Sequence, residues 1–174
     1  MRTKLTTLIA TIFLLAGITH VAVADDSDKG FRWVPVSGTA IHYFTTAIIH
    51  SEDFSDTGKK QRSTDSIDLD GDLVGRILYQ PHSKFDFVAG TLVNTGRQVF
   101  SGTVLGSKPV LIYDDEFRFD VNLATGETTG AVFLTDRIAG PRIKCELQIV
   151  GTGFTPEGDG LANYSGHCKM RTGK

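Results

Sequence analysis

From residue 25 onward the sequence alternates apolar and polar residues, and this alternation restricts the chain to folds built from β-strands. No stretch after Ala24 sustains apolar residues at helical spacing, whereas a period of two, typical of half-buried strands, recurs many times. Valine, isoleucine, threonine, phenylalanine and tyrosine are frequent there and suit a pleated sheet. The pattern predicts strands at residues 33–36, 40–50, 66–79, 84–89, 98–105, 110–122, 130–138, 143–150 and 161–170.

Short turns rich in glycine, proline, asparagine and aspartate separate most of these strands, as in Asn94-Thr95-Gly96 and Ala139-Gly140-Pro141. The expected arrangement is therefore an antiparallel meander. An open sheet of this size would expose apolar faces and two unpaired edges, so the sheet must close or fold over. We predict a single all-β domain over residues 31–174 that closes into a small eight-stranded β-barrel, with a β-sandwich as the alternative.

The first residues have the order of a secretory signal peptide. Arg2 and Lys4 precede an apolar stretch over residues 8–18, and Ala22-Val23-Ala24 follows, which predicts cleavage after residue 24. The apolar stretch is about half of the roughly 20 residues that a membrane-spanning helix needs. We therefore expect a soluble exported protein with no membrane span, located in the periplasm or outside the cell.

The charge of the chain disfavours nucleic acid as a partner. The sequence has 18 basic and 20 acidic residues, and loss of Arg2 and Lys4 with the leader would leave 16 basic residues and a net charge of −4. Nucleic acids select basic surfaces because their phosphates are anionic. The sequence gives no indication of the oligomeric state.

Two cysteines lie in the part expected to be exported, where disulfides persist. Alternation places Cys145 on the inward face of one predicted strand and Cys168 on the inward face of the next. If the intervening loop turns about Pro156-Glu157, Cys145 lies opposite Cys168 and Leu147 opposite Gly166. Opposed Cβ atoms in such a pair are ~4.5–5.5 Å apart, so we predict a structural disulfide, with two buried free thiols as the alternative.

Two polar segments interrupt the strand pattern. Residues 25–30 form a short polar lead that we expect to be mobile. Residues 51–64 contain a single apolar side chain, Phe54, and we predict that they form a long polar loop, disordered or functional.

Several glycine-containing segments resemble the skeleton of allene-oxide-cyclase-like barrels, which are small antiparallel eight-stranded barrels found in plant and bacterial cyclases and in other bacterial proteins. The segments that carry the resemblance are Asp70-Gly71-Asp72-Leu73-Val74-Gly75, residues 100–106, Thr125-Gly126, Gly151-Thr152-Gly153 and Tyr164-Ser165-Gly166. The resemblance covers residues 68–169 and implies the barrel fold. It assigns no active-site residue, because no position matches one of a cyclase.

Motifs of common enzyme classes are absent from the sequence, including Gly-x-Ser-x-Gly, the phosphate-binding glycine loops and His-Glu-x-x-His. The acidic run at residues 68–72 fails the EF-hand pattern, because Leu73 and Tyr79 occupy the positions of its glycine and glutamate. We interpret it as an Asp-Gly turn, and we predict neither a metal site nor a cofactor. His42 is interpreted as a partly exposed strand residue, with contact to a ligand inside the barrel as the alternative.

An eight-stranded barrel can be filled by its own side chains or can hold one small ligand. The eleven phenylalanines favour an apolar interior, and the predicted wall consists of Phe85, Phe87, Phe117, Phe119 and Phe133, which could equally be ordinary core residues. The candidates for proton transfer, should the protein be an enzyme, are Tyr43, Tyr113, Glu116 and Asp120.

Three functions are compatible with these observations. The first is non-enzymatic binding of a small apolar ligand or a partner, which the absence of a catalytic motif favours. The second is a cyclase or isomerase that acts on an apolar substrate inside the barrel. The third is a secreted interaction protein that uses an edge strand or the segment 51–64. The identity of the ligand or substrate does not follow from the sequence.

Overall fold

The computed structural model describes residues 30–171, which form eleven strands and one short 3-10 turn. The predicted signal peptide and all of the polar lead except Gly30 lie outside the described residues. The elements are β1 (Phe31–His42), η2 (Phe44–Thr46), β2 (Ile48–Ser55), β3 (Gly58–Gly71), β4 (Leu73–Asp86), β5 (Thr91–Val104), β6 (Val110–Asp114), β7 (Arg118–Asn122), β8 (Thr128–Leu134), β9 (Asp136–Ala139), β10 (Lys144–Phe154) and β11 (Gly160–Arg171).

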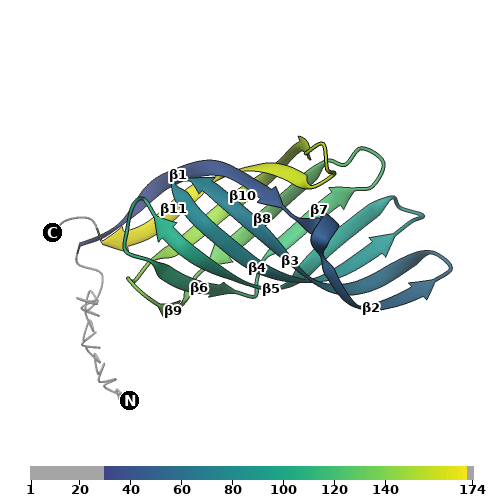
Figure 1. The fold of residues 1–174 in the computed structure, drawn as a ribbon, viewed down its shortest axis with the longest axis horizontal. Coiled ribbons are helices and arrows are strands. Elements are labelled where there is room, and N and C mark those ends of the chain that lie inside the picture. Colours follow the sequence, from purple (N-terminus) through teal and green to yellow (C-terminus); the bar gives the residue numbers. More distant parts are fainter. Residues whose placement is uncertain (1–29, 172–174) are drawn as a thin grey trace, which may run out of the picture.

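Eight of these strands close into an antiparallel β-barrel (Figure 1). Around the barrel the order is β3, β1, β11, β10, β8, β7, β5 and β4, and β4 pairs again with β3. Strands β2, β6 and β9 are additional to this ring. Strand β2 extends β3, β6 pairs with the part of β5 (residues 98–102) that β7 leaves unpaired, and β9 pairs with β6. The prediction of a small eight-stranded barrel is confirmed, and the sandwich alternative is wrong, because pairing of β3 with both β1 and β4 closes the sheet on itself.

The register of the last hairpin follows the alternation in the sequence. Cys145 pairs with Cys168 and Leu147 with Gly166, as the turn near Pro156 predicted. The two cysteines form a disulfide, and both are fully buried. The predicted disulfide is therefore confirmed, and it ties β10 to β11 in the barrel interior.

One half of the barrel interior is filled by large side chains. We call the end at which β1 begins and β11 ends the packed half. Its inward-facing residues are Val36, Leu73, Phe100, Val104, Ile112, Leu134, Ile143, Leu147, Tyr164 and the disulfide, all buried. The Tyr164 hydroxyl crosses the interior, accepts a hydrogen bond from the Leu73 backbone N–H (2.7 Å) and donates one to the Leu73 carbonyl (3.2 Å). A Cβ at Gly38 would overlap the Tyr164 ring, so this crossing requires glycine there.

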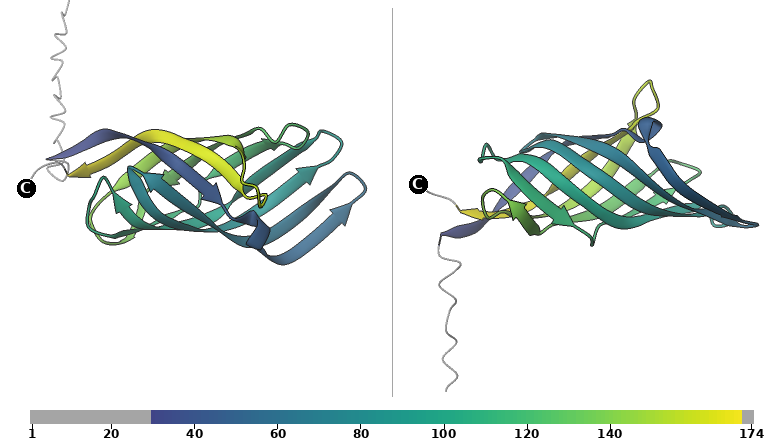
Figure 2. Two further views of the ribbon diagram at one scale, coloured as in Figure 1. Left: turned by 45° about the horizontal axis from the view of Figure 1, so that its top comes forward. Right: turned by 60° about the horizontal axis from the view of Figure 1, so that its bottom comes forward.

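The polar segment at residues 51–64 is a β-hairpin, and the prediction of a loop is wrong. Strand β2 pairs with the first half of β3, which in turn pairs with β4, so the hairpin extends the barrel wall at one end (Figure 2). Period-two burial is present in β3, but its inward residues include the polar Ser63 and Asp65, which hid the strand from a search for apolar alternation. An interaction through this segment would use a strand edge and not a flexible loop.

Four predicted strands are interrupted. The stretch 110–122 is divided into β6 and β7 at residues 115–117, and the stretch 130–138 is divided into β8 and β9 at Thr135. The other two contain turns. The stretch 66–79 reverses at Gly71, which has φ +112°, and the Asp70-Gly71-Asp72 run forms the turn between β3 and β4. The stretch 40–50 is divided by η2, so His42 lies on β1 and His50 on β2. In these two cases the apolar residues on both sides of a short turn make the two strands look continuous in the sequence.

Candidate functional site

The half of the barrel opposite the packed half contains a cavity of about 530 Å³. We call this end the hollow half. Several strands that have large inward-facing residues in the packed half have small inward-facing residues in the hollow half. Those small residues are Ala40, Ser63, Ser83, Thr128, Gly151, Gly160 and Ala162. The cavity therefore arises from side-chain size along strands whose backbone pairing is continuous from one half to the other.

Most of the cavity wall is apolar. The hydrocarbon and aromatic side chains come from every side of the barrel. They are Ile49, Ile67, Leu69, Ile77, Phe85, Leu92, Phe119, Val121, Val132, Ile149, Phe154 and Leu161. Such a wall attracts apolar ligands by the hydrophobic effect and gives them no fixed orientation.

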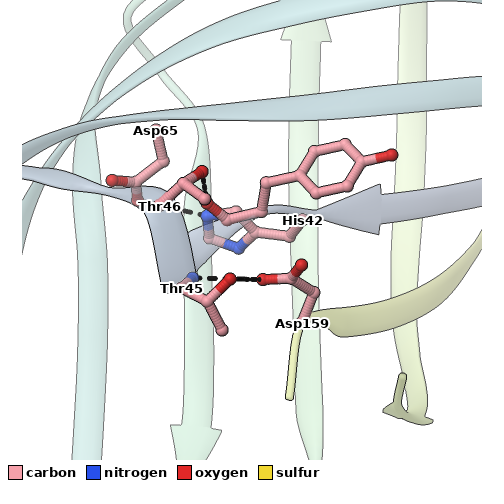
Figure 3. A network of polar contacts seen from close by, with 6 residues as sticks. His42, Thr45, Thr46, Asp65 and Asp159 are labelled. Carbon is pink, nitrogen blue, oxygen red and sulfur yellow. Dashed lines mark hydrogen bonds and ion pairs between the residues drawn. The ribbon is translucent and has the colours of Figure 1, made fainter. Parts of the chain in front are cut away.

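Polar side chains cluster on one side of the same cavity, and we call them the polar floor: His42, Asp65, Tyr79, Asn94 and Gln98. His42 Nε2 lies 3.1 Å from Asp65 Oδ2 (Figure 3). The Asp65 side chain is only 5% exposed, and that of His42 is 28% exposed. This pair therefore places a carboxylate oxygen deep in an otherwise apolar cavity and holds it there through the imidazole.

Three residues of the floor belong to a single row across neighbouring strands. Asp65 on β3 pairs directly with Tyr79 on β4, Tyr79 with Gln98 on β5, and Gln98 with Asp114 on β6. Gln98 Nε2 donates to Asp114 Oδ2 at 2.7 Å, and Asp114 also accepts from the backbone N–H groups of Phe133 and Glu116. The hydrogen bond from Gln98 to Asp114 thus holds the Gln98 side chain of the polar floor in place.

Tyr79 is buried among aromatic rings beside the polar floor. Its ring centroid lies 4.8 Å from that of Phe117 and 5.2 Å from that of His42. Burial raises the pKa of Tyr79 well above its ordinary value near 10, the negative charge of Asp65 raises it further, and a hydrogen bond with Asn94 acts in the opposite direction. The phenol therefore stays protonated at physiological pH.

Three buried oxygens of the floor lack a hydrogen-bond partner within the part of the chain that the structure describes. They are Asp65 Oδ1, Asn94 Oδ1 and Gln98 Oε1. An unsatisfied buried polar group costs about 1–3 kcal/mol, so such groups are rare in protein interiors. All three belong to residues that line one cavity, so this side of the cavity has hydrogen-bonding capacity that the described residues do not use.

A short rim segment borders the cavity on the β1 side. The backbone N–H and hydroxyl of Thr45 in η2 both donate to Asp159 Oδ1, at 3.1 and 2.6 Å (Figure 3). The adjacent Phe44 ring packs edge-on against His42 and Phe154, with centroids 5.4 and 6.2 Å apart. The turn between β10 and β11 thereby anchors the aromatic rim above His42.

The predicted phenylalanine wall is only partly at the cavity. Phe85 and Phe119 line it. Phe117 is buried beneath it against Tyr79, Phe133 is half-buried at an outward position next to the inward Val132, and Phe87 is 55% exposed. Phe87 follows the end of β4, where alternation no longer controls which way a side chain points.

None of the four candidates for proton transfer lines the cavity. Tyr43 lies near the ion pair between Asp68 and Arg76, with the guanidinium carbon 6.0 Å from the Tyr43 ring centroid. Asp120 pairs with Arg118 on the exposed face of β7. Tyr113 is half-buried next to the inward Ile112, and Glu116 is exposed after β6.

The floor residues Asp65, Tyr79, Asn94 and Gln98 were not among the candidates from the sequence, although the alternative interpretation of His42 as a cavity residue agrees with its position. The sequence feature that could have identified them is a polar residue at an inward-facing position of a strand. Asp65 shares the parity of Ile67 and Leu69, and Gln98 that of Phe100. Odd or even position along a strand identifies which side chains face inward. It does not determine whether an inward side chain contacts a packed core or a cavity.

Among residues 30–171 no group of three or more histidine, cysteine, aspartate or glutamate side chains is placed to bind a metal ion. The same residues include no helix long and apolar enough to cross a membrane. No family model, curated protein or solved structure matches the chain. The resemblance to allene-oxide-cyclase-like barrels therefore extends to the closed eight-stranded fold and assigns no family.

Proposed function

We propose that this protein is an exported barrel that binds one small, largely apolar molecule in the hollow half without transforming it. The observation that carries the proposal is the cavity of about 530 Å³ with its apolar wall and localised polar floor. Small-molecule sites typically enclose about 300–1,000 Å³ and combine apolar walls with a few convergent polar groups. The packed half closes the opposite end, so the ligand would enter from the rim around Phe44 and Phe154.

The rim itself suits entry of an apolar molecule. Phe44, Ile49 and Phe154 line the cavity and are 40–58% exposed. Burial of apolar ligand surface contributes about 25 cal/mol per Å², and the exposed rim side chains would be covered at the same time. Export agrees with the buried disulfide between Cys145 and Cys168, because oxidising compartments preserve such bonds.

The experiment is a titration of the purified mature protein with the fluorescent hydrophobic probe N-phenyl-1-naphthylamine, followed by native mass spectrometry for stoichiometry. We expect saturable enhancement with one probe per chain. Ala162→Phe places a ring in the cavity opposite Ala40 and Gly151 and should abolish the enhancement. Ser165→Phe, at an exposed position of the same strand, is the matched control and should bind normally. Equal binding by both variants would refute the cavity as the site.

One observation favours a second candidate, an isomerase or cyclase acting on an apolar substrate. His42, oriented by Asp65, and the protonated Tyr79 border the same cavity and could respectively accept and donate a proton. Incubation with an apolar lipid extract tests this idea by chromatography for products of unchanged mass. The candidate predicts turnover that His42→Gln and Tyr79→Phe abolish while probe binding is retained. Binding with no turnover by the wild type leaves the binding function alone.

A further inference from the structure

The polar floor contains three hydrogen-bond acceptors that still need donors. Asp65 Oδ1, Asn94 Oδ1 and Gln98 Oε1 are buried and unpaired within residues 30–171. The residues that line the cavity over this range include no lysine or arginine, and His42 is already engaged with Asp65. The site therefore offers oxygen acceptors and a carboxylate, with no fixed cation to receive an anion.

The neighbouring hydrogen bonds determine which end of the Gln98 amide faces the cavity. Asp114 is 2% exposed, and its carboxylate accepts from three N–H groups, of which one is Gln98 Nε2. A carboxylate held by donors needs the amide nitrogen and would repel the amide oxygen. Gln98 Oε1 is consequently the free end, and it can be satisfied only by a donor from elsewhere.

Asp65 is fixed in a similar way. Its Oδ2 is occupied by His42 Nε2 at 3.1 Å, so Oδ1 remains for a further donor. Because Asp65 and Gln98 flank Tyr79 in the cross-strand row and both residues line the cavity, their side chains lie on the same side of it, with the free oxygens themselves buried. A hydrogen bond to an ionised acceptor is worth about 1.5–3 kcal/mol, which makes Asp65 the stronger of the two recognition points.

We infer that the polar floor recognises the hydrogen-bond-donating head of an amphiphile, an alcohol or a primary amine, and excludes carboxylates. This inference rests on the proposed binding function and specifies the ligand class. A hydroxyl supplies one donor, and an ammonium group supplies three and a positive charge beside Asp65. An ionised carboxylate supplies no donor and would be desolvated beside an existing negative charge. The hydrocarbon part of the ligand would lie against the apolar wall.

Displacement of the bound naphthylamine probe by four ligands of equal chain length tests the inference: 1-decanol, decylamine, decanoate and methyl decanoate at neutral pH. We expect the alcohol and the amine to bind at least about tenfold more tightly than the carboxylate, since one satisfied acceptor is worth roughly tenfold in affinity. The affinity of the ester should lie between that of the alcohol and that of the carboxylate. Carboxylate binding equal to or tighter than that of the alcohol would overturn the inference. Binding of all four without a head-group preference would overturn it but preserve the proposed function. Failure of the probe and of all four would refute the proposed function itself.

Two variants assign the preference to the floor. Gln98→Met removes the free acceptor at nearly constant volume and should reduce the alcohol-to-ester affinity ratio by at least about threefold. Gln148→Met on the exposed face of β10 is the matched control and should leave this ratio unchanged. Asp65→Asn removes the charge but keeps an acceptor, so it should lower the amine affinity more than the alcohol affinity. If Gln98→Met does not fold, the Asp65→Asn variant is the decisive test. An amine-to-alcohol affinity ratio that is unchanged in Asp65→Asn would overturn the inference.

Discussion

The packed and hollow halves of this barrel share strands such as β1, β10 and β11 but use the inward positions of these strands in opposite ways. On β11 the inward residues progress from Ala162 in the hollow half to Tyr164 and Cys168 in the packed half, and on β1 from Ala40 to Val36. An eight-stranded barrel lies at the size limit where side chains can either fill the interior or leave room for one ligand. On these strands side-chain volume therefore decides between a filled core and a cavity.

The two halves also differ in how their buried polar groups are satisfied. The Tyr164 hydroxyl in the packed half makes two hydrogen bonds to Leu73. In the hollow half, three buried oxygens remain free among the described residues. The buried hydroxyl of the packed half is thus satisfied within the protein, whereas the hollow half contains buried acceptors that are not.

The largest expected effect comes from truncating one phenylalanine in each half. Phe100→Ala empties a fully buried site in the packed half and should lower the free energy of unfolding by about 3–5 kcal/mol. Phe85→Ala enlarges an existing cavity at a half-buried position and should cost about 1 kcal/mol. Urea denaturation measures both. Equal losses would show that the two halves do not differ in packing.

Removal of the disulfide should have the next largest effect. The bond joins residues 23 positions apart, and the chain-entropy model assigns about 3 kcal/mol to closing a loop of this size. The double variant Cys145→Ala with Cys168→Ala should lose about this amount in urea denaturation and should still bind the hydrophobic probe, because neither cysteine lines the cavity. Loss of probe binding in a variant that remains folded would indicate that the halves are coupled.

Ligand binding should stabilise the hollow half selectively. At a free concentration of 100 times the dissociation constant, a ligand raises the free energy of unfolding by about 2.7 kcal/mol. Local openings that the ligand suppresses should slow amide hydrogen exchange in β2, the first half of β3, and β7. Exchange around Leu73 and Phe100 should change least under native conditions, and a uniform change over all strands would contradict a site confined to the hollow half.

The smallest effect is a difference in alkaline stability between two tyrosine variants. Because burial raises the pKa of Tyr79 in the folded state, its contribution is complete below the unfolded value near 10 and is lost as the pH rises above it. Tyr79→Phe should therefore flatten the alkaline decline in stability. Burial also raises the pKa of Tyr164, so Tyr164→Phe should flatten the decline as well, but it should in addition lower stability by about 1 kcal/mol already at neutral pH, because it removes the bonds to Leu73. Denaturation at stepped pH distinguishes them, and identical profiles would contradict the assignment.

Local patterns predicted the features that depend on neighbouring strands. Alternation in β10 and β11 and a turn near Pro156 were sufficient to place Cys145 opposite Cys168. The same approach failed for β2 and the start of β3, because Ser63 and Asp65 are polar residues facing inward. It also favoured surface acids such as Asp120 over Asp65, because only long-range pairing brings β1, β3, β4 and β5 together around His42 and Gln98.

The sequence by itself determined the all-β class, the inward faces of β10 and β11 and the pairing of the two cysteines, because a pleated strand alternates its side chains whatever its partners are. Only the tertiary structure decided that the sheet closes between β1 and β3 and that one end of the interior remains hollow. Closure brings together positions distant in the chain, and a cavity depends on the summed volume of side chains from all eight strands.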